Sequence, residues 1–487
     1  MKSLGGKIIV KIYKLTVVGV ISFCLCLLLS ACQPALPRAV DDHNTQSLPD
    51  FPDGGRVSMF LSLVEVDIPL VILQVASIEI LSDEIWIPLL ATPVYFDSKK
   101  LAKGQIFLAS RSIAPGAYSR MRITVNSAVK KDPAGRSVKM EVSNPLKEII
   151  FKEPLVVTKE NTKTIFLEFD GITSIDGNRL TDLDFTAKME QSVPVTANLA
   201  YVSCPAQDTI YIIRTDKNWV TGAIAVSGGP TSLVADSDAK KLYVLTSKPA
   251  FIITIDLTTR NVLDEIRVPF ASEPFYMTMS EDFKSAYLID NSGSIIRINI
   301  DSGNMESRAR IGQRPTYLIP LNAYDQLAVS STLDQNLYLI NATSLAIENT
   351  IRLGGPPQGL LVFDNLLYIA ESISNNVSVY DLSNHQVLQR ISVSADPYRF
   401  ASVGQSLYVT NQERGEVSML HGGQLYISKI IPVGDSVHEM AVAEMQRLLY
   451  VSTGGALGGV TVIDLTSNTV ISKIGLGARP QGVVVVQ

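Results

Sequence analysis

Side chains that could bind or transform a ligand gather beside a proline that recurs through residues 198–487. The proline stands at Pro230, Pro274, Pro315, Pro357, Pro397 and Pro480, with Val437 at the equivalent point of one unit. The neighbouring candidates for ligand binding are Glu273, Tyr276, Arg314, Tyr317, Gln358, Asp396, Tyr398, Arg399, His438, Glu439, Arg479 and Gln481, with Phe275 and Thr316 among them. Aromatic faces beside carboxylates, guanidinium groups and amides suit a polar ligand or a peptide.

Two other interpretations of these residues remain open. Oxygen and nitrogen donors that could hold a divalent cation, or supply the base of a lyase or lactonase, come from Glu273, Asp396, His438 and Glu439. Alternatively, Arg314 pairs with Glu273 or Asp396, and the ring of charges neutralises itself around an inert channel. The sequence assigns no catalytic residue, no metal ligand and no cofactor.

The composition argues against several function classes. With 42 Lys+Arg against 47 Asp+Glu, the chain lacks the basic excess that binds nucleic-acid phosphates. There is no Cys-x-x-Cys-His haem motif, and four histidines are too few for a multi-histidine copper cluster. No serine nucleophile elbow has a plausible histidine partner. Nucleic-acid binding and redox catalysis are therefore not expected.

The candidate residues sit on an internal repeat. A second marker keeps the same period as the proline and begins at Tyr201, Tyr243, Tyr287, Ala328, Tyr368, Tyr408 and Tyr450, at intervals of 42, 44, 41, 40, 40 and 42 residues. The last complete unit predicts four short strands, over residues 438–443, 448–452, 459–465 and 470–476. A four-stranded unit of this length is typical of a propeller blade, whose inner strands line a central channel.

The repeat resembles the YVTN-type β-propellers. The motif that names them stands here as Tyr408-Val409-Thr410-Asn411, and residues 459–464 and 478–483 are also similar to that family. The resemblance covers about 290 residues. The resemblance implies a fold. It does not imply an activity, because that family includes surface proteins, sensors and a few enzymes.

The ends of the repeat predict how the ring closes. Its first unit begins at a second strand, near Leu199, and residues 481–487 form an inner strand with nothing after it. Pairing the two completes seven blades without a long exposed edge. The expected fold is therefore all-β, with a seven-bladed propeller over residues 198–487.

Residues 56–195 predict a separate β-sandwich. Strands are expected over residues 57–66, 71–81 and 164–170, which are rich in β-branched and aromatic residues and separated by turn signals. This segment resembles a β-sandwich domain of unknown function that recurs in bacterial lipoproteins, on motifs at residues 67–69, 114–122 and 166–170. Arg120, Arg122 and Asp170 could form a site, but a cross-strand ion pair with solvated edge charges is the favoured interpretation.

The N-terminus predicts export and anchoring. Four lysines precede an apolar run over residues 15–29, which is too short to span a bilayer and is typical of a signal peptide over residues 1–31. Leu29-Ser30-Ala31-Cys32 resembles a bacterial lipobox, which implies cleavage before Cys32, a diacylglyceryl thioether on its sulfur and an acylated amine. Residues 32–55, rich in proline and polar residues, predict a lipidated tether.

These features predict a lipid-anchored protein of the bacterial cell envelope, held in the outer membrane if the host has two membranes. We expect it to bind or scaffold a protein or polysaccharide partner. The alternative is a propeller hydrolase or lyase that acts on a lactone, glycan or peptide.

Overall fold

The computed structural model describes residues 50–486 apart from 52, 66, 103, 133, 192, 194–197, 425 and 456. The predicted signal peptide, Cys32 and most of the predicted tether lie outside these residues. Strands dominate the described part, and its α-helices, α2 (Ser98–Leu101) and α3 (Gly171–Ser174), are single turns. None of the helices described is long and apolar enough to cross a membrane.

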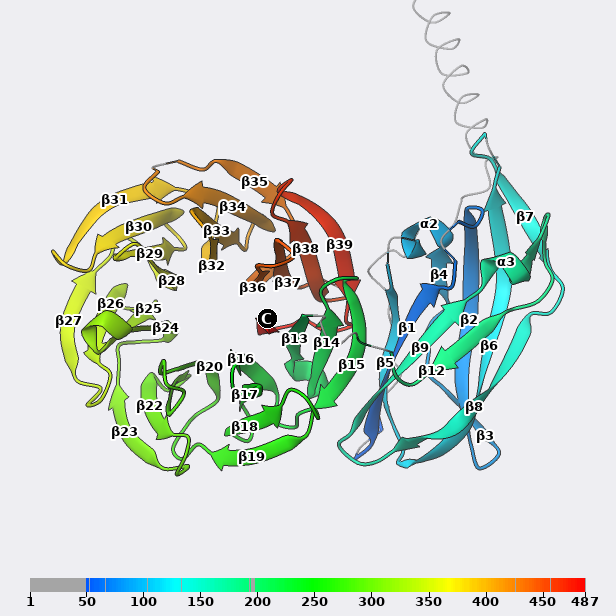
Figure 1. Ribbon diagram of the computed structural model, residues 1–487, viewed down its shortest axis with the longest axis horizontal. Coiled ribbons are helices and arrows are strands. Elements are labelled where there is room, and N and C mark those ends of the chain that lie inside the picture. Colours follow the sequence, from blue (N-terminus) through cyan, green and yellow to red (C-terminus); the bar gives the residue numbers. More distant parts are fainter. Residues whose placement is uncertain are drawn as a thin grey trace, which may run out of the picture. The chain divides into compact units, whose positions relative to one another are not determined.

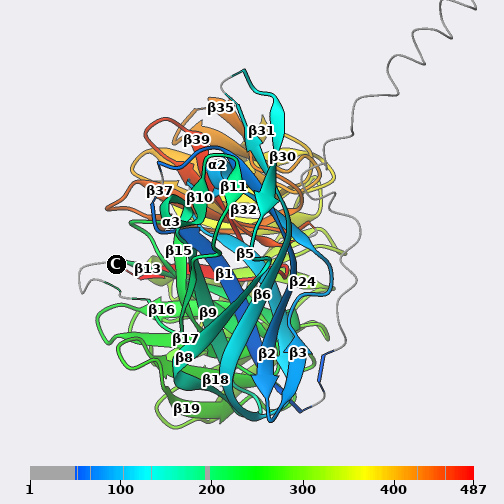
Figure 2. The same ribbon diagram turned by 90° about the vertical axis from the view of Figure 1, so that its right-hand side faces the viewer.

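Residues 55–188, called the N-terminal β region here, contain two sheets. The first sheet has the strand order β12 (Phe185–Lys188), β9 (Thr162–Phe169), β1 (Gly55–Leu63) and β5 (Ile106–Ile113). The second has the order β10 (Ile175–Asp176), β11 (Arg179–Leu180), β7 (Ser137–Val142), β6 (Gly116–Lys131), β2 (Val71–Ser82) and β3 (Ile85–Pro88), with β4 (Val94–Asp97) also on β2 and β8 (Leu146–Val157) on β6. Figure 2 shows β6, β2 and β3 running side by side.

The two sheets share one apolar core. Leu61 and Phe169 of the first sheet pack with Ile80 and Ile123 of the second, and all four side chains are buried. In β2, buried residues alternate with partly exposed ones, as expected for a strand with one face on a core. β1 is different: it is buried almost throughout. It also ends at Leu63 rather than at residue 66 as the sequence predicted.

Residues 199–486 form four-stranded antiparallel sheets, called blades below, in a propeller-like arrangement (Figure 1). From the inner strand outward, they are β16 (Pro230–Asp236), β17 (Lys241–Thr246), β18 (Phe251–Asp256) and β19 (Val262–Arg267); β20 (Pro274–Met279), β21 (Ser285–Asp290), β22 (Ser294–Asn299) and β23 (Met305–Arg310); β24 (Pro315–Leu321), β25 (Gln326–Ser331), β26 (Asn336–Asn341) and β27 (Ile347–Arg352); β28 (Pro357–Phe363), β29 (Leu366–Glu371), β30 (Asn376–Asp381) and β31 (Gln386–Ser392); β32 (Pro397–Val403), β33 (Ser406–Asn411), β34 (Glu416–His421) and β35 (Lys429–Pro432); β36 (Val437–Ala443), β37 (Leu448–Thr453), β38 (Gly459–Asp464) and β39 (Thr469–Gly475); and finally β40 (Val483–Val486), β13 (Leu199–Cys204), β14 (Thr209–Arg214) and β15 (Trp219–Ala225).

The inner strands touch one another in a closed cycle: β16 meets β20, each following inner strand meets the next, and β40 meets β16. Apolar side chains fill the spaces between neighbouring blades. Tyr408 and Val417 of one blade, for example, pack with Met440, Val451 and Ile463 of the next. A single blade therefore cannot bury its own faces, and the stability of the ring depends on contacts between blades.

The ring closes by pairing the last strand with the first. β40 runs antiparallel to β13, with Ala200 opposite Val485. Just before this strand, the Gly482 N–H donates to Ser203 Oγ at 2.8 Å. This is the pairing that the sequence predicted. Cys204 ends β13, is fully buried, and is a free cysteine.

The N-terminal β region and the blade β13–β15 share buried contacts within one compact unit, residues 42–487. Phe60 of β1 packs on Phe166 and Phe107 of its own region and, edge to face, on Tyr211 of β14. The Tyr211 hydroxyl lies 2.9 Å from Ser58 Oγ. This contact explains why β1 is buried on both faces.

Candidate functional site

The inner strands other than β40 start with an irregularity that turns side chains toward the channel. In β16, β20, β24, β28, β32 and β36 the pairing with the second strand shifts register just after the first residue. Such β-bulges redirect side chains and often lie beside functional sites. Here they bring two successive residues of each strand to the channel.

These residues make two rings. The upper ring, one residue after the repeated proline, is Thr231, Phe275, Thr316, Gln358, Tyr398, His438 and Gln481. The lower ring, one residue further on, is Ser232, Tyr276, Tyr317, Gly359, Arg399, Glu439 and Gly482.

The residue before the proline forms a rim and often has a left-handed backbone. Glu273, Arg314 and Asp396 have φ of +51°, +62° and +61°, and Gly229 fills the same place before β16 with φ of +68°. This conformation costs an L-residue roughly 1–2 kcal/mol. Only the glycine adopts it without that cost.

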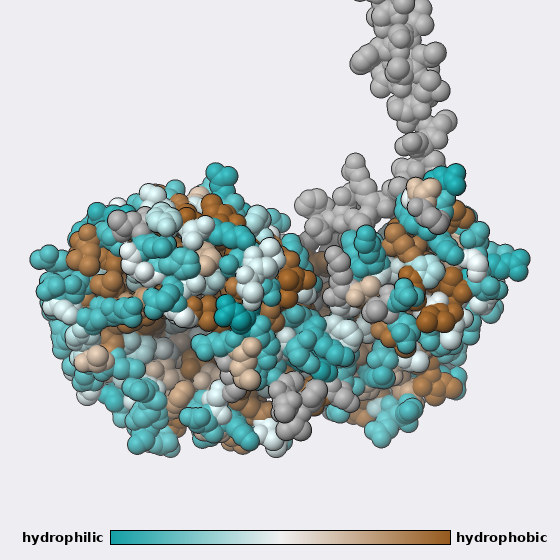
Figure 3. Space-filling view, turned by 45° about the horizontal axis from the view of Figure 1, so that its top comes forward, coloured by the Kyte–Doolittle hydropathy of each residue, from teal (hydrophilic) through white to brown (hydrophobic). Residues whose placement is uncertain are grey.

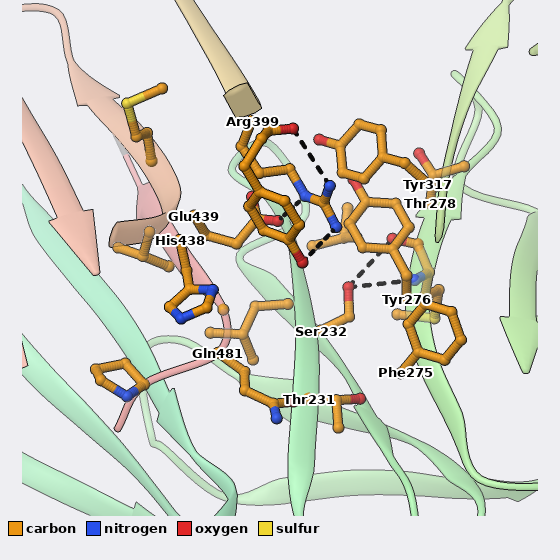
Figure 4. Close-up of a pocket in the computed structure, with 18 of the residues that line it drawn as sticks. Thr231, Ser232, Phe275, Tyr276, Thr278, Tyr317, Arg399, His438, Glu439 and Gln481 are labelled. Atoms are coloured by element: carbon orange, nitrogen blue, oxygen red, sulfur yellow. Dashed lines mark hydrogen bonds and ion pairs between the residues drawn. The ribbon is translucent and has the colours of Figure 1, made fainter. Parts of the chain in front are cut away.

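Arg399 fills the centre of the lower ring (Figure 4). Its guanidinium carbon lies 3.9 Å from the ring centre of Tyr398 and 4.3 Å from that of Tyr317. Its Nε donates to Glu439 Oε1 at 2.6 Å, and its Nη2 donates to the Thr316 carbonyl at 3.2 Å. The side chain therefore reaches from β32 past β28 to β24. On β28, a Cβ at Gly359 would stand only 2.2 Å from the Tyr398 carbonyl oxygen, so the glycine is needed for this close approach.

Burial dominates the electrostatics of this cluster. It raises the pKa of the Glu439 carboxyl, and the Arg399 guanidinium opposes that rise. Burial also raises the pKa of the Tyr276 and Tyr317 phenols, so both stay neutral. The Arg399 charge is thus balanced by Glu439 within the cluster. The aromatic faces that could hold a foreign cation already hold Arg399.

A cavity of about 520 Å³, called the mouth cavity below, opens above these rings. Its lining includes the upper-ring residues Phe275, Gln358, Tyr398 and His438, the rim residues Arg314 and Arg479, and residues from the turns after the second strands, among them Asn291, Leu333, Ile373 and Gln412. A second cavity of about 450 Å³ lies against the lower ring and shares Phe275, Tyr398, His438 and Arg479 with the first.

His438 joins the two cavities. Its Nε2 contacts Arg479 Nη2, and its Nδ1 lies 2.8 Å from the Gln412 amide nitrogen. Burial, and then the charges of Arg479 and Arg399, lower the pKa of His438 to about 4. The imidazole is therefore neutral at pH 7 and accepts from Arg479 without neutralising its charge.

Arg314 is an exposed cation of the rim, as is Arg479. No side chain in the described part of the protein forms a hydrogen bond or ion pair with the Arg314 guanidinium group. The predicted pairing of Arg314 with Glu273 is wrong: Glu273 pairs with Lys248, at 2.5 Å. Lys248 belongs to the turn after β17, which the proline marker does not include.

The four donors proposed for a cation do not converge. Glu439 is engaged by Arg399 and Glu273 by Lys248. Asp396 is half-buried, and its pKa is raised by burial and by nearby Glu413. Within the described residues, no group of three or more histidine, cysteine, aspartate or glutamate side chains could hold a metal ion.

Ten of the twelve predicted ligand-binding residues line one or both cavities, and Glu273 and Asp396 line neither. Sequence reasoning missed Leu333 and Ile373, which stand on the turns after the second strands of adjacent blades. One signal could have found them: both are large aliphatic residues in a turn. At the equivalent turn positions of three other blades the chain has the polar residues Lys248, Ser292 and Glu413.

The second predicted cluster does not assemble. Arg122 on β6 pairs with Glu79 on β2 at 2.6 Å, which is a cross-strand ion pair of the kind that the favoured interpretation expected. Asp170 instead accepts from the backbone N–H groups of Ile172 and Thr173 at the start of α3. Arg120 is exposed.

Comparisons with known proteins support the fold. No protein-family model matches the chain, and no curated protein matches it. Among solved structures, a functionally unknown protein from Desulfotomaculum acetoxidans DSM 771 matches with a TM-score of 0.54 and 14% identity, over 60% of this chain and 99% of that one. A candidate 6-phosphogluconolactonase from Bacteroides fragilis NCTC 9343 matches with a TM-score of 0.52 and 13% identity, over 61% and 100% of the two chains. The β-propeller domain of Myceliophteria thermophila Cps50 is more distant, with a TM-score of 0.46 and 13% identity over 53% and 90%. The β-propeller fold itself is shown by the four-stranded sheets whose inner strands meet in a closed cycle.

Proposed function

We propose that this protein is a lipid-anchored binding protein of the cell envelope, and that it recognises its partner at the mouth cavity. In this proposal the ring is a seven-bladed propeller of the YVTN type, and the N-terminal β region is the sandwich domain that carries it. The observation that supports binding most directly is Arg314, which lines the cavity, has a left-handed backbone and has no side-chain partner among the residues that the structure describes.

The Arg314 side chain contributes little to the stability of the fold. Its backbone conformation costs roughly 1–2 kcal/mol, and a glycine in its place would avoid this cost. Arg399, by contrast, has a carboxylate, a carbonyl and aromatic faces around it. A ring of purely structural ion pairs would give Arg314 a partner as well. Left-handed residues occur in turns of this chain, as at Arg447, and are also enriched at ligand sites.

The proposed location rests on the N-terminal sequence. A basic segment, an apolar run and small residues before Cys32 together support lipidation at that sulfur. Two or three acyl chains would anchor the protein stably, whereas one would not. Because Glu439 and Glu273 are both engaged by cations, we do not extend the proposal to the metal-assisted hydrolase or lyase that the sequence left open.

The test compares two arginines with the same backbone conformation. Arg314→Gly removes the mouth cation, whereas Arg447→Gly removes an exposed arginine with φ of +52° from the turn between β36 and β37. Both changes relieve left-handed strain, so both variants should melt about 2 °C higher than the wild type. Only Arg314→Gly should lose the envelope components that the tagged full-length protein retains in mild detergent. Equal retention by both variants, or no specific retention by the wild type, would contradict the proposal.

A further inference from the structure

We propose that the ligand of the mouth cavity is a polypeptide segment that places a carboxylate between Arg314 and Arg479 and an aliphatic side chain against Leu333 and Ile373. This inference rests on the proposed function and names the substrate class of the same site. It follows from the charge, the apolar surface and the depth of the cavity.

The lining of the mouth cavity is cationic. It includes Arg314 and Arg479, and it includes no aspartate or glutamate. Among the described side chains, the Arg479 guanidinium contacts only the uncharged His438 ring, so its charge is not compensated there. Asp396 and Glu413 lie at the same end of the propeller, outside this lining. An anion that enters the cavity therefore meets a lining with two guanidinium groups and no carboxylate.

Beside these cations the cavity exposes aliphatic surface. Leu333 is 65% exposed and Ile373 is 81% exposed, although both are large apolar residues. They occupy equivalent turns of adjacent blades, after β25 and after β29, and both line the mouth cavity. In the view of Figure 3, hydrophobic side chains form groups separated by hydrophilic ones. Leu333 and Ile373 thus offer an apolar ligand group a place to bury next to the charged one.

The combination favours a peptide over an acidic polysaccharide. A hydroxylated sugar ring would use the arginines but would gain little from the side chains of leucine and isoleucine. A peptide can combine a carboxylate and an aliphatic side chain within a few residues. The amides of Asn291, Gln358 and Gln412 also line the cavity and can pair with a peptide backbone.

The depth of the site limits how the segment binds. Below the mouth, Arg399 packs on Tyr276 and Tyr317 and pairs with Glu439, so these side chains occupy part of the lower ring beside the second cavity. We therefore infer that a peptide lies across the mouth and inserts side chains.

The probe is a random dodecapeptide display library selected on the full-length protein in detergent. We expect the enriched peptides to combine Asp or Glu with Leu, Ile or Val within four positions. Synthetic copies should bind at least tenfold more weakly to Arg314→Gly and to the double variant Leu333→Ser/Ile373→Ser, and should bind Arg447→Gly as they bind the wild type. Affinity should also fall as salt is raised, because the rim charges are exposed.

Several outcomes would overturn the inference. Enriched peptides without acidic residues, or with affinity unaffected by the serine variants, would contradict the proposed class. Polygalacturonate that binds through Arg314 but independently of Leu333 and Ile373 would assign the site to acidic polysaccharides instead. If the selection fails while envelope components are still retained through Arg314, the ligand class is wrong and the proposed function stands. If both fail, the mouth is not a binding site.

Discussion

Arg399 and Glu439 form an ion pair inside the propeller channel, with Nε 2.6 Å from Oε1, although they belong to the inner strands of two different blades. The side chains are 4% and 20% exposed. Two adjacent blades are thereby linked by a charged hydrogen bond that is largely shielded from water, which makes the bond stronger than a surface pair.

Replacing Glu439 should therefore destabilise the ring. Glu439→Gln leaves the Arg399 charge buried without a counter-ion, and the free energy of unfolding should fall by about 3 kcal/mol. Urea denaturation followed by tryptophan fluorescence measures this loss. Glu273→Gln is the matched control at the same mouth: its pair with Lys248 is exposed, so its unfolding curve should stay close to that of the wild type. If the two variants unfold alike, the buried pair does not stabilise the ring.

The neutral state of His438 should make stability depend on pH. The pKa of this imidazole in the folded protein is about 4, against an ordinary value of 6.5, because burial and then Arg479 and Arg399 disfavour the charged form. Between these two values the unfolded chain binds a proton that the folded chain does not. Stability should therefore fall as pH drops from 6.5 to 4, and His438 should contribute no pH dependence above that window.

Thermal melts across this range provide the measurement. The decrease in melting temperature should be smaller in His438→Gln than in the wild type, because glutamine does not titrate. His385→Gln, which changes a histidine on an exposed turn, is the control and should retain the full decrease. A wild-type decrease that persists unchanged in His438→Gln would show that other groups cause it.

The sequence predicted the ring and most of the mouth because both depend on periodic features. Strands with a period of two and a unit of about 40 residues place equivalent residues at equivalent positions, so residues beside the proline must converge. The pairing of the last strand with β13 follows from the same count.

The ion pairs could not be predicted in this way. Which arginine meets which carboxylate depends on the bulge at the start of the inner strand, on the left-handed residue before the proline and on the close approach of the Tyr398 backbone that Gly359 permits. Lys248, the partner of Glu273, comes from a turn between two other strands. Likewise, β1 does not alternate in burial, since its second face meets the propeller, a contact that no local pattern records.

Anchoring depends on a single sulfur in the proposed location. Cys32→Ser should either release the protein from membranes or leave its precursor uncleaved, because the acyl chains have no other attachment site in the lipobox. Fractionation and the mass of the N-terminal peptide measure both effects. Cys26→Ser, which changes a cysteine within the apolar run, should leave partitioning as in the wild type. Unchanged membrane association of Cys32→Ser would refute lipidation at that residue.

The shared core around Phe60 should couple the N-terminal β region to the propeller in unfolding. Phe60 is fully buried between Phe166 and Tyr211, so Phe60→Ala should cost roughly 3–5 kcal/mol through lost burial and the cavity left behind. If this contact couples the two parts, the variant should show two separate calorimetric transitions where the wild type shows one. Phe96→Ala is the control, since Phe96 packs on Phe169 within the N-terminal β region alone. It should destabilise that region without removing the contact with Tyr211, and the transitions should stay merged. Two transitions already present in the wild type would show that the buried contact does not couple the parts, and the mouth would then be carried on an independently unfolding propeller.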